Sequence, residues 1–358
     1  MSTQAYFRAE RFAREGDLPA AVDAFRVLLE ESPEHLAGWR SLSDLLAQLG
    51  DTQQSEDAAQ RANVIEADHI TDVGKSLLFH GDYERAESFF ARALAINDEC
   101  LNAHWLLGEC HSHGGSREKA LMHYARCLEI EPDHQGPAFM IAALGEAESP
   151  ARAPDDYVTS FFDWYADHFD EHLTKNLKYV GPQRVAAALR DARPQGVECA
   201  LDLGCGTGMA GVAARDSAAR FIGVDLSPEM LRRAEETGVY AQLIEADLIA
   251  ALQGLPEGSV DAAIAADVLV YVGALEELFA ELTRVMGPDG VFIATFETNP
   301  AGESWELSES GRYRHSDAYL RQVSAEYGLG QYAMSELVLR EEYGEPVKSM
   351  IVTFGRSS

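Results

Sequence analysis

The stretch Ala200-Leu201-Asp202-Leu203-Gly204-Cys205-Gly206-Thr207-Gly208 decides the predicted fold of this chain. Apolar residues at 199–201 and 203 predict a buried strand, and the small residues at 209–214 predict a helix after the three glycines. Glycine lets a ligand touch the backbone, and the first N–H groups of a helix favour a negative or strongly polar group. The sequence therefore predicts a strand, a tight turn and a helix that together cradle a polar ligand.

A second predicted strand, at 221–224, ends at Asp225, where a carboxylate is placed to accept hydrogen bonds from a ribose. Two ligand classes use this arrangement. Dinucleotide enzymes have the spacing G-x-G-x-x-G, which leaves room for a pyrophosphate. This chain has G-x-G-x-G, with Asp202 two residues before the first glycine, so the spacing disfavours a nicotinamide-dependent oxidoreductase.

The glycine loop and residues 223–227 resemble two consecutive motifs of class I S-adenosylmethionine-dependent methyltransferases. Residues 161–173, 266–273 and 310–316 resemble blocks of a bacterial group of these enzymes that is fused to tetratricopeptide repeats. The resemblance implies S-adenosylmethionine as the cofactor and a Rossmann-like domain with a seven-stranded sheet. It implies no particular methyl acceptor.

Length, charge and cysteine content bound the class of protein. With 358 residues the chain is long enough for two domains, and a hydrophobic content of 46% is ordinary for globular protein. The formal net charge of −30 argues against nucleic acid or an anionic membrane as a partner. Five cysteines without a paired pattern, and the lack of a signal-peptide core or a membrane-length apolar run, predict a cytoplasmic protein.

Residues 1–147 contain a repeat. The turn glycines Gly16, Gly50, Gly81 and Gly115 are 34, 31 and 34 residues apart, and a helical pattern follows each of them. A helix–turn–helix unit of this length resembles the tetratricopeptide repeat, here in about four copies with a capping helix at 139–144. Ala67 stands where proline is usual at the end of the second copy, which makes that copy degenerate.

Stacked repeats of this kind leave a concave groove that usually binds a protein or peptide partner. Packing of the repeats on the chain's own catalytic domain, or on a second copy in a homodimer, is an equally open alternative.

Residues 148–156 have the composition of a linker, which makes 157–358 the predicted catalytic domain. Aromatic residues between 157 and 173 recur at helical spacing, so lid helices over the cofactor and ordinary core packing are both open. His168 and His172 are four residues apart on this predicted helix. No third ligand follows from the spacing, so we predict no metal site.

Strands and helices alternate after residue 197, as a doubly wound parallel sheet requires. The next strands are predicted at 242–247, at 260–271 (running into an apolar loop) and at 291–296. A turn is predicted at 288–290, and segments 329–339 and 347–354 predict a closing hairpin. The predicted fold class is therefore a helical repeat domain followed by an α/β domain (α + α/β).

The resemblance implies a role for each residue at the ends of these strands. The three glycines of the loop lie under the methionine portion, Asp225 holds the ribose, Asp247 binds the adenine amine, and Asp267 lies near the ammonium and sulfonium. Leu226 and Met230 pack on adenine. The implied cofactor-binding residues are Asp202, Gly204, Cys205, Gly206, Gly208, Asp225, Leu226, Met230, Asp247, Leu248, Asp267 and Val268. Carboxylates suit this cofactor because it carries two positive charges and two ribose donors.

The acceptor side is expected after the fifth strand, where the candidate catalytic residues are Glu297, Arg312, Tyr313 and His315. A histidine titrates near neutrality, so His315 is the first choice of general base. Arg312 is suited to clamp an acidic acceptor with its planar fork. A structured turn at 311–315, whose polar groups satisfy one another, is the alternative.

The sequence thus predicts a cytoplasmic S-adenosylmethionine-dependent methyltransferase with an N-terminal tetratricopeptide-repeat domain. The methyl acceptor, a small metabolite or a protein, is not identified. A non-catalytic adaptor, with the repeats as its functional surface and a vestigial nucleotide-binding fold, is the alternative function.

Overall fold

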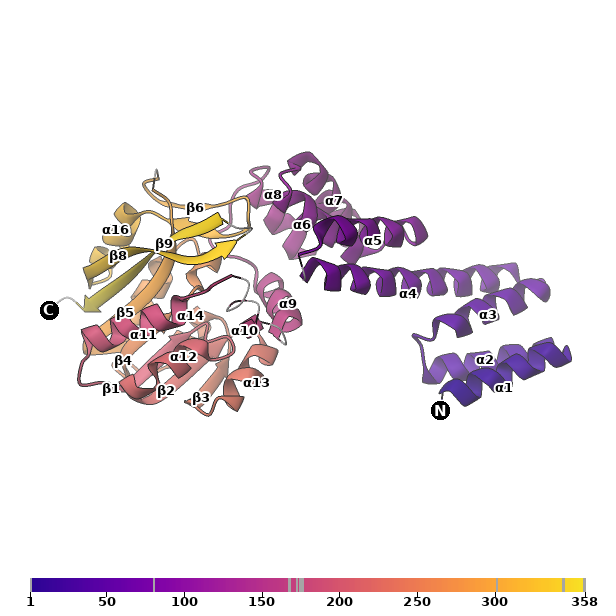
Figure 1. Cartoon of the computed structure of the whole chain (residues 1–358), viewed down its shortest axis with the longest axis horizontal. Coiled ribbons are helices and arrows are strands. Elements are labelled where there is room, and N and C mark those ends of the chain that lie inside the picture. Colours follow the sequence, from indigo (N-terminus) through magenta and orange to yellow (C-terminus); the bar gives the residue numbers. More distant parts are fainter. Residues whose placement is uncertain are drawn as a thin grey trace. The chain divides into compact units, whose positions relative to one another are not determined.

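The computed structural model of the chain describes residues 2–79, 81–166, 169–171, 173, 177–300, 302–342 and 345–356. The chain divides into two compact units, Met1–Pro137 and Ala138–Ser358 (Figure 1). His168 and His172 lie outside the described residues. Each unit is described by itself below.

The first unit consists of antiparallel helix pairs. Its helices are α1 (Ser2–Glu15), α2 (Leu18–Glu31), α3 (Leu36–Gln48), α4 (Thr52–Phe79), α5 (Tyr83–Ile96), α6 (Leu101–His113) and α7 (Arg117–Ile130), and α8 (Gln135–Ala143) follows. The four predicted turn glycines all have positive φ values, between 71° and 82°, which a side chain would strain. Asp17 and Asp82 then cap α2 and α5 by accepting a backbone N–H.

Helix α4 is a single helix of 28 residues (Figure 1). Pro33 and Pro132 follow the ends of α2 and α7, and proline at such a position prevents a helix from continuing. Ala67 is the corresponding residue of the second copy and keeps its backbone N–H, so the helix runs on into the third copy. Two separate apolar clusters meet this helix, one spanning residues 9–58 and the other, which includes Ala67 itself, spanning residues 67–110. The degenerate second copy is therefore joined to the third by a rigid helix instead of a turn.

The second unit is built on one mixed sheet. Its strands are β1 (Val197–Leu203), β2 (Ala218–Asp225), β3 (Tyr240–Glu245), β4 (Val260–Ala265), β5 (Met286–Thr298), β6 (Trp305–Leu307), β7 (Tyr313–His315), β8 (Leu329–Glu342) and β9 (Glu345–Arg356). The order is β3-β2-β1-β4-β5-β7-β6, with β9 antiparallel to β5 and β8 antiparallel to β9. The α + α/β class is confirmed. The described sheet contains the seven expected strands and, in addition, the three-residue strands β6 and β7.

Helices cover both faces of this sheet. Its helices are α9 (Asp155–Tyr165), α10 (Phe169–Glu171), α11 (Gly181–Ala192), α12 (Met209–Ala214), α13 (Pro228–Glu236), α14 (Leu248–Gly254), α15 (Glu276–Val285) and α16 (Asp317–Glu326). One core cluster packs α11 and α12 against the sheet, and another packs α14, α15 and α16 against it. Burial on both faces explains the near-continuous apolar runs of the parallel strands.

The predicted turn at 288–290 is part of β5. Val260 pairs with Met286, and Ala262 already pairs with Val291, so the residues between these partners bulge out of the ladder. A proline and a glycine disturb the pairing here, but β9 holds the rest of β5 from the other side.

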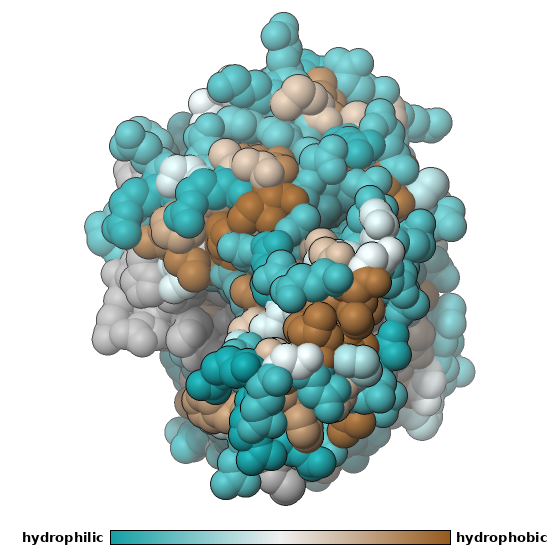
Figure 2. Space-filling view, turned by 90° about the vertical axis from the view of Figure 1, so that its right-hand side faces the viewer, coloured by the Kyte–Doolittle hydropathy of each residue, from teal (hydrophilic) through white to brown (hydrophobic). Residues whose placement is uncertain are grey.

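The surface is mainly polar, in line with the excess of acidic residues. In Figure 2, hydrophilic side chains predominate on the face shown, and apolar ones gather in separate patches. None of the described helices is both long enough and apolar enough to span a bilayer.

The continuity of α4 predicts different responses to proline in adjacent repeats. Ala67→Pro removes a helical hydrogen bond and is expected to lower the free energy of unfolding by about 3 kcal/mol or more. Asp98→Pro, at the equivalent position between α5 and α6, is the matched control and should cost less than about 1 kcal/mol, because no helix crosses it. Urea denaturation followed by circular dichroism measures both values. Equal values for the two variants would contradict a continuous α4.

Candidate functional site

The predicted cofactor-binding residues lie at the carboxyl ends of four adjacent parallel strands. Asp202 belongs to β1 and Asp225 ends β2, while Asp247 follows β3 and Asp267 follows β4. Strands β3, β2, β1 and β4 are neighbours in that order, so their ends form one edge of the sheet. Ligands of open α/β sheets bind at such an edge.

The three glycines of the loop have different reasons for being glycine, although all have positive φ values. A Cβ on Gly204 would lie 2.3 Å from Cγ2 of Val268, and one on Gly208 would lie 3.1 Å from Tyr240 and Thr237. Among the described residues, only Phe169 lies within 4 Å of a Cβ placed on Gly206, at 3.8 Å. Gly204 and Gly208 therefore serve packing within the protein, and Gly206 is the position that exposes backbone to a ligand.

Asp225 connects the glycine loop to the end of β2. Its Oδ2 accepts the N–H of Gly206 at 2.8 Å, and its Oδ1 accepts the N–H of Ser227 at 3.0 Å. Burial raises the pKa of Asp225, and these backbone donors oppose the shift. A carboxylate has about four acceptor sites, so each oxygen keeps a lone pair for a further donor such as a ribose hydroxyl.

Asp202 is buried beneath the loop. Its Oδ2 accepts the hydroxyl of Tyr240 at 2.6 Å, and its Oδ1 has no hydrogen-bond partner among the described residues. Burial raises the pKa of Asp202 to about 7, although the Tyr240 hydroxyl works in the other direction. A buried carboxylate oxygen without a partner fits a site that receives a cationic or donor group from a ligand.

Asp247 caps α14. Its Oδ1 accepts the N–H groups of Ile249 and Ala250 at 2.9 and 3.3 Å and contacts a guanidinium nitrogen of Arg152 at 3.1 Å. These described contacts all use Oδ1, which leaves Oδ2 as the acceptor for an amine.

The apolar residues of the predicted site differ in exposure. Leu226, Leu248 and Val268 are partly buried, as expected for side chains that border the predicted cofactor site, called the notch below. Cys205 and Met230 are buried. Cys205 packs with Leu231 and Ala234 beneath the notch, so we expect it to support the loop through its side chain.

Asp267 has a protein cation as its partner, which the sequence did not predict. Both of its carboxylate oxygens contact Nη1 of Arg340, at 2.6 and 2.8 Å, and its N–H donates to Thr295. Its φ of 62° is in the left-handed region, a conformation that costs energy for a residue other than glycine. Asp267 is thus ion-paired with Arg340 at the end of β4, and its contact with a cofactor stays a prediction.

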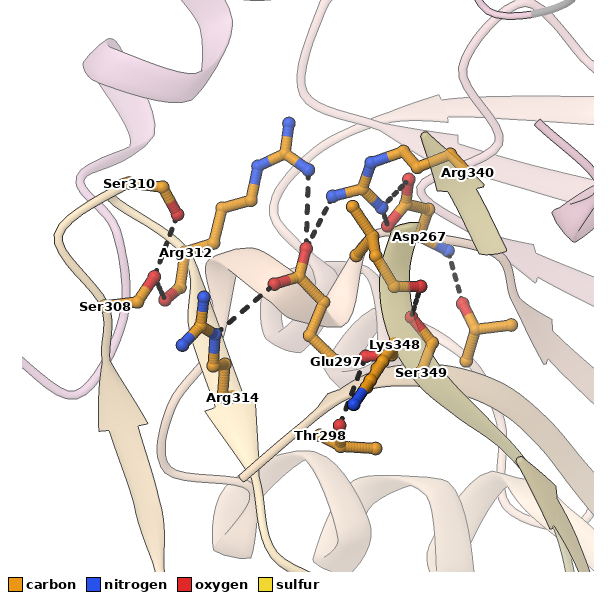
Figure 3. Close-up of polar contacts among 12 residues, drawn as sticks. Asp267, Glu297, Thr298, Ser308, Ser310, Arg312, Arg314, Arg340, Lys348 and Ser349 are labelled. Carbon is orange, nitrogen blue, oxygen red and sulfur yellow. Dashed lines mark hydrogen bonds and ion pairs between the residues drawn. The ribbon is translucent and has the colours of Figure 1, made fainter. Parts of the chain in front are cut away.

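Glu297, near the end of β5, is the centre of a second set of contacts (Figure 3). Its Oε1 contacts Nη2 of Arg340 at 2.5 Å and Nη1 of Arg312 at 3.4 Å, and its Oε2 lies 3.8 Å from Nε of Arg314. Figure 3 shows Glu297 between Arg312 on one side and Arg340 on the other. Three guanidinium groups therefore meet at one buried carboxylate.

His315, the first choice of general base, is fully buried. Its Nε2 lies 3.0 Å from the carbonyl oxygen of Gly273, and burial lowers its pKa to about 4. A base must reach the proton that it removes, and this ring contacts the backbone instead. The structure therefore supports the alternative, a structured turn, and does not support His315 as the base.

Tyr313 is also committed to the fold. Its hydroxyl donates to the carbonyl oxygen of Pro150 at 2.7 Å, and burial raises its pKa. Arg312 and Glu297 are the two acceptor-side candidates that the structure brings together.

The segment between 155 and 171 contacts the glycine loop through two carboxylates that the sequence reading did not single out. Asp163 accepts the hydroxyl of Ser227 at 2.5 Å, and Asp170 accepts the hydroxyl of Thr207 at 2.5 Å. Phe169 lies over Gly206. Their only signal in the sequence is the acidic and aromatic pattern of residues 157–173, and the contacts favour a lid over core packing.

Other features of the site were also missed. Tyr179 is buried, and burial raises its pKa, with a further contribution from Asp267.

Among the described residues, no group of three or more His, Cys, Asp or Glu side chains is arranged to hold a metal ion.

The burial of His315 predicts an acid-dependent loss of stability. Its pKa is lower in the folded state, at about 4, than in the unfolded state, at about 6.5. The unfolded state therefore binds more protons between these values, and stability falls as the pH falls through this window. His315→Gln, which does not titrate, should remove about 3 kcal/mol of this pH dependence, measured by urea denaturation at pH 4 and pH 7. The matched control His69→Gln, at an exposed position of α4, should leave the dependence unchanged.

Comparison with known proteins agrees with a repeat region followed by a methyltransferase domain. Residues 201–294 match the family model of a methyltransferase domain, and residues 6–67 and 72–134 match the tetratricopeptide repeat. Squalene methyltransferase 1 of Botryococcus braunii is 31% identical over 157 residues, which cover 40% of this chain and 40% of that protein. Methyltransferase-like protein 27 of Homo sapiens is 34% identical over 148 residues, which cover 39% of this chain and 57% of that protein.

One solved structure with a similar fold is the 1,6-didemethyltoxoflavin-N1-methyltransferase of Burkholderia thailandensis, with a TM-score of 0.48 and 16% identity. The likeness covers 59% of this chain and 94% of that chain. The curated relatives, in contrast, are matched over about half of their length. Residues 201–294 of the chain are therefore a methyltransferase domain, and the residues before it carry tetratricopeptide repeats.

Proposed function

We propose that the protein transfers a methyl group from S-adenosylmethionine to an acceptor bound beside the ends of β4 and β5. The observation that carries this proposal is the glycine loop, where a Cβ on Gly206 would meet Phe169 alone among the described residues, at 3.8 Å, next to carboxylates on the ends of neighbouring strands. S-adenosylmethionine supplies a methyl group on a positively charged sulfur. Carboxylates stabilise that charge when the compound binds.

We propose that the cofactor is held by carboxylates whose oxygens can still accept a hydrogen bond. Asp225 would accept the ribose hydroxyls, and Asp247 the adenine amine through Oδ2. Asp202 would receive the ammonium group, directly or through water, with its buried Oδ1. Leu226 and Leu248 would flank the adenine ring, and Val268 would border the methionine portion over Gly204.

The lid segment would exclude water from this site. Asp163 and Asp170 each fasten it to a hydroxyl on the rim of the notch, on opposite sides of Phe169 along the chain. Exclusion of water strengthens the electrostatic attraction inside the site and protects the activated methyl group from hydrolysis.

We propose the domain limits 1–147 for the repeats, 148–156 for the linker and 157–358 for the catalytic domain. The repeats would bind a protein or peptide partner or a second copy of the chain, since stacked helix pairs offer a groove for this. The location proposed for the protein is the cytoplasm. The names of the relatives support methyl transfer in general, and they differ in the compounds named.

Calorimetric titration with S-adenosylhomocysteine and with NAD tests the cofactor. We expect the first to bind and NAD not to bind. Asp225→Asn should weaken the binding by roughly 10- to 100-fold, because a ribose hydroxyl loses its charged acceptor. Asp216→Asn, an exposed aspartate, is the control for the same change of charge. Equal affinities of the two variants would remove Asp225 from the site.

Labelled methyl transfer distinguishes the enzyme from the adaptor. With a cell extract as the source of acceptors, the enzyme should transfer more than one methyl group per protein molecule. An adaptor with a vestigial fold would transfer none while still binding the cofactor product.

A further inference from the structure

The three arginines around Glu297 are an unusual concentration of positive charge in this chain. The chain has 29 Lys and Arg against 59 Asp and Glu, so a positive region is the exception. Arg312, Arg314 and Arg340 carry three positive charges, which their partners Glu297, Asp267 and Glu306 balance with three negative ones. Arg314 also lies 4.0 Å from Glu306, at the outer end of the cluster.

This cluster extends from the cofactor notch to the surface. At its inner end, Arg340 is 1% exposed and holds Asp267, the residue next to Val268, which covers Gly204. At its outer end, the side chains of Arg312 and Arg314 are 23% and 44% exposed. Arg314 is held opposite Glu297 by the pairing of β7 with β5 (Figure 3). A ligand that reaches Arg312 and Arg314 therefore lies beside the proposed transfer site.

The candidate bases on the acceptor side are engaged with the protein itself. His315 contacts the carbonyl oxygen of Gly273, and Tyr313 donates to Pro150. Tyr319, a further phenol that follows β7 on α16, contacts Leu275 and Glu276. An amine or phenol must lose a proton in order to accept a methyl group, whereas a carboxylic acid is already ionised at neutral pH. A carboxylate is therefore the acceptor that can be methylated without a residue to remove a proton.

Resting on the function proposed above, we infer that the methyl acceptor is a carboxylate, held by Arg312 and Arg314 and converted to its methyl ester. One carboxylate oxygen forms a bond to the methyl carbon, and the bond between that carbon and sulfur breaks. The electron pair of the broken bond stays on sulfur, which becomes neutral as the carboxylate loses its charge. No proton is taken up or released, so no base is required.

The guanidinium fork explains how the acceptor is oriented. Arginine presents five N–H donors in one plane and binds a carboxylate through two parallel hydrogen bonds. Nη1 of Arg312 and Nε of Arg314 both face the carboxylate of Glu297. Glu297 therefore orients both guanidinium groups. The acidic surface elsewhere repels an anionic acceptor, which favours its entry at this cluster.

The chemical stability of the product tests this inference. The full chain is incubated with methyl-labelled S-adenosylmethionine and a cell extract, and the products are treated with mild alkali. We expect the label to be released as volatile methanol, as from a methyl ester. Separation by size shows whether the acid is a small molecule or part of a protein. Label that survives alkali, as in methylated amines, ethers or carbon, would overturn the inference and leave the proposed function standing. Absence of any transfer would overturn the proposed function, and this inference with it.

A second readout needs no cofactor. Phenylglyoxal modifies accessible arginines, and mass spectrometry locates the modified residues. The acidic fraction of the extract should protect Arg312 and Arg314, and the same fraction should lose this effect once its carboxyl groups have been esterified. Equal modification with both fractions would overturn the inference.

Variants separate binding of the acceptor from a structural role. Arg314→Gln should lower transfer roughly tenfold or more, through loss of charged hydrogen bonds, while the affinity for S-adenosylhomocysteine changes less than about twofold. Arg314→Lys keeps the charge but not the fork and should recover part of the transfer. Arg321→Gln, on the exposed face of α16, is the matched control. A loss of cofactor affinity or thermal stability in Arg314→Gln that accounts for the lost transfer would show a structural role and overturn the assignment.

Discussion

The site depends on one carboxylate that is hydrogen-bonded to two backbone segments. Asp225, at the end of β2, accepts the N–H of Gly206 from the loop after β1 and the N–H of Ser227 from the start of α13. These bonds fix the glycine loop in the position in which the backbone of Gly206 faces the proposed ligand site. Because the same carboxylate faces the notch, the position of the loop and the position of the acceptor atoms are determined together. Pre-organisation of this kind lowers the cost of ordering a site when a ligand binds.

The acidic residues at the sheet edge fall into two groups with different partners. Asp202 and Asp225 accept hydrogen bonds from neutral donors, and Asp247 contacts Arg152 through Oδ1 but keeps Oδ2 for a ligand. Asp267 and Glu297 share Arg340, and Glu297 also contacts Arg312 and Arg314. The carboxylates with spare oxygens therefore lie in the cofactor half of the edge, next to a half in which three arginines balance the carboxylates of Asp267, Glu297 and Glu306. A cationic methyl donor and an anionic acceptor would each be attracted to its own half.

The sequence predicted the elements whose pattern is local. The strand, glycine turn and helix at 200–214, the strand end at Asp225 and the repeat turns follow from short-range periodicity and turn chemistry, and the fold has them at these positions. The third strand ends at Glu245, two residues before the predicted end at Asp247, which caps α14 instead. The burial of His315 was not predictable, because it depends on the pairing of β7 with β5 and on a contact with Gly273, 42 residues away.

Arg340 was missed for a more specific reason. Simple alternation places it on the same face of β8 as Val338, which is 50% exposed. The register of β8 against β9 shifts between Val338 and Arg340, so Leu339 and Arg340 are both buried. A β-bulge of this kind turns a side chain inward against the pattern, and such bulges are common beside active sites. The acceptor-side network could therefore not be derived from spacing alone.

The unbroken helix α4 has a consequence for how the repeat region transmits force and unfolding. In a regular array, each repeat is stabilised by its interface with the next, and cooperativity spreads through these interfaces. Here the link between the second and third copies is a backbone rod of 28 residues, about 42 Å long at the usual rise per residue. Tension or a bound partner at one end is carried along the hydrogen-bonded ladder of a single helix. Because Ala67 is fully buried in the second apolar cluster, melting of the helix near it would also disturb that cluster, so the rod couples the unfolding of the two halves.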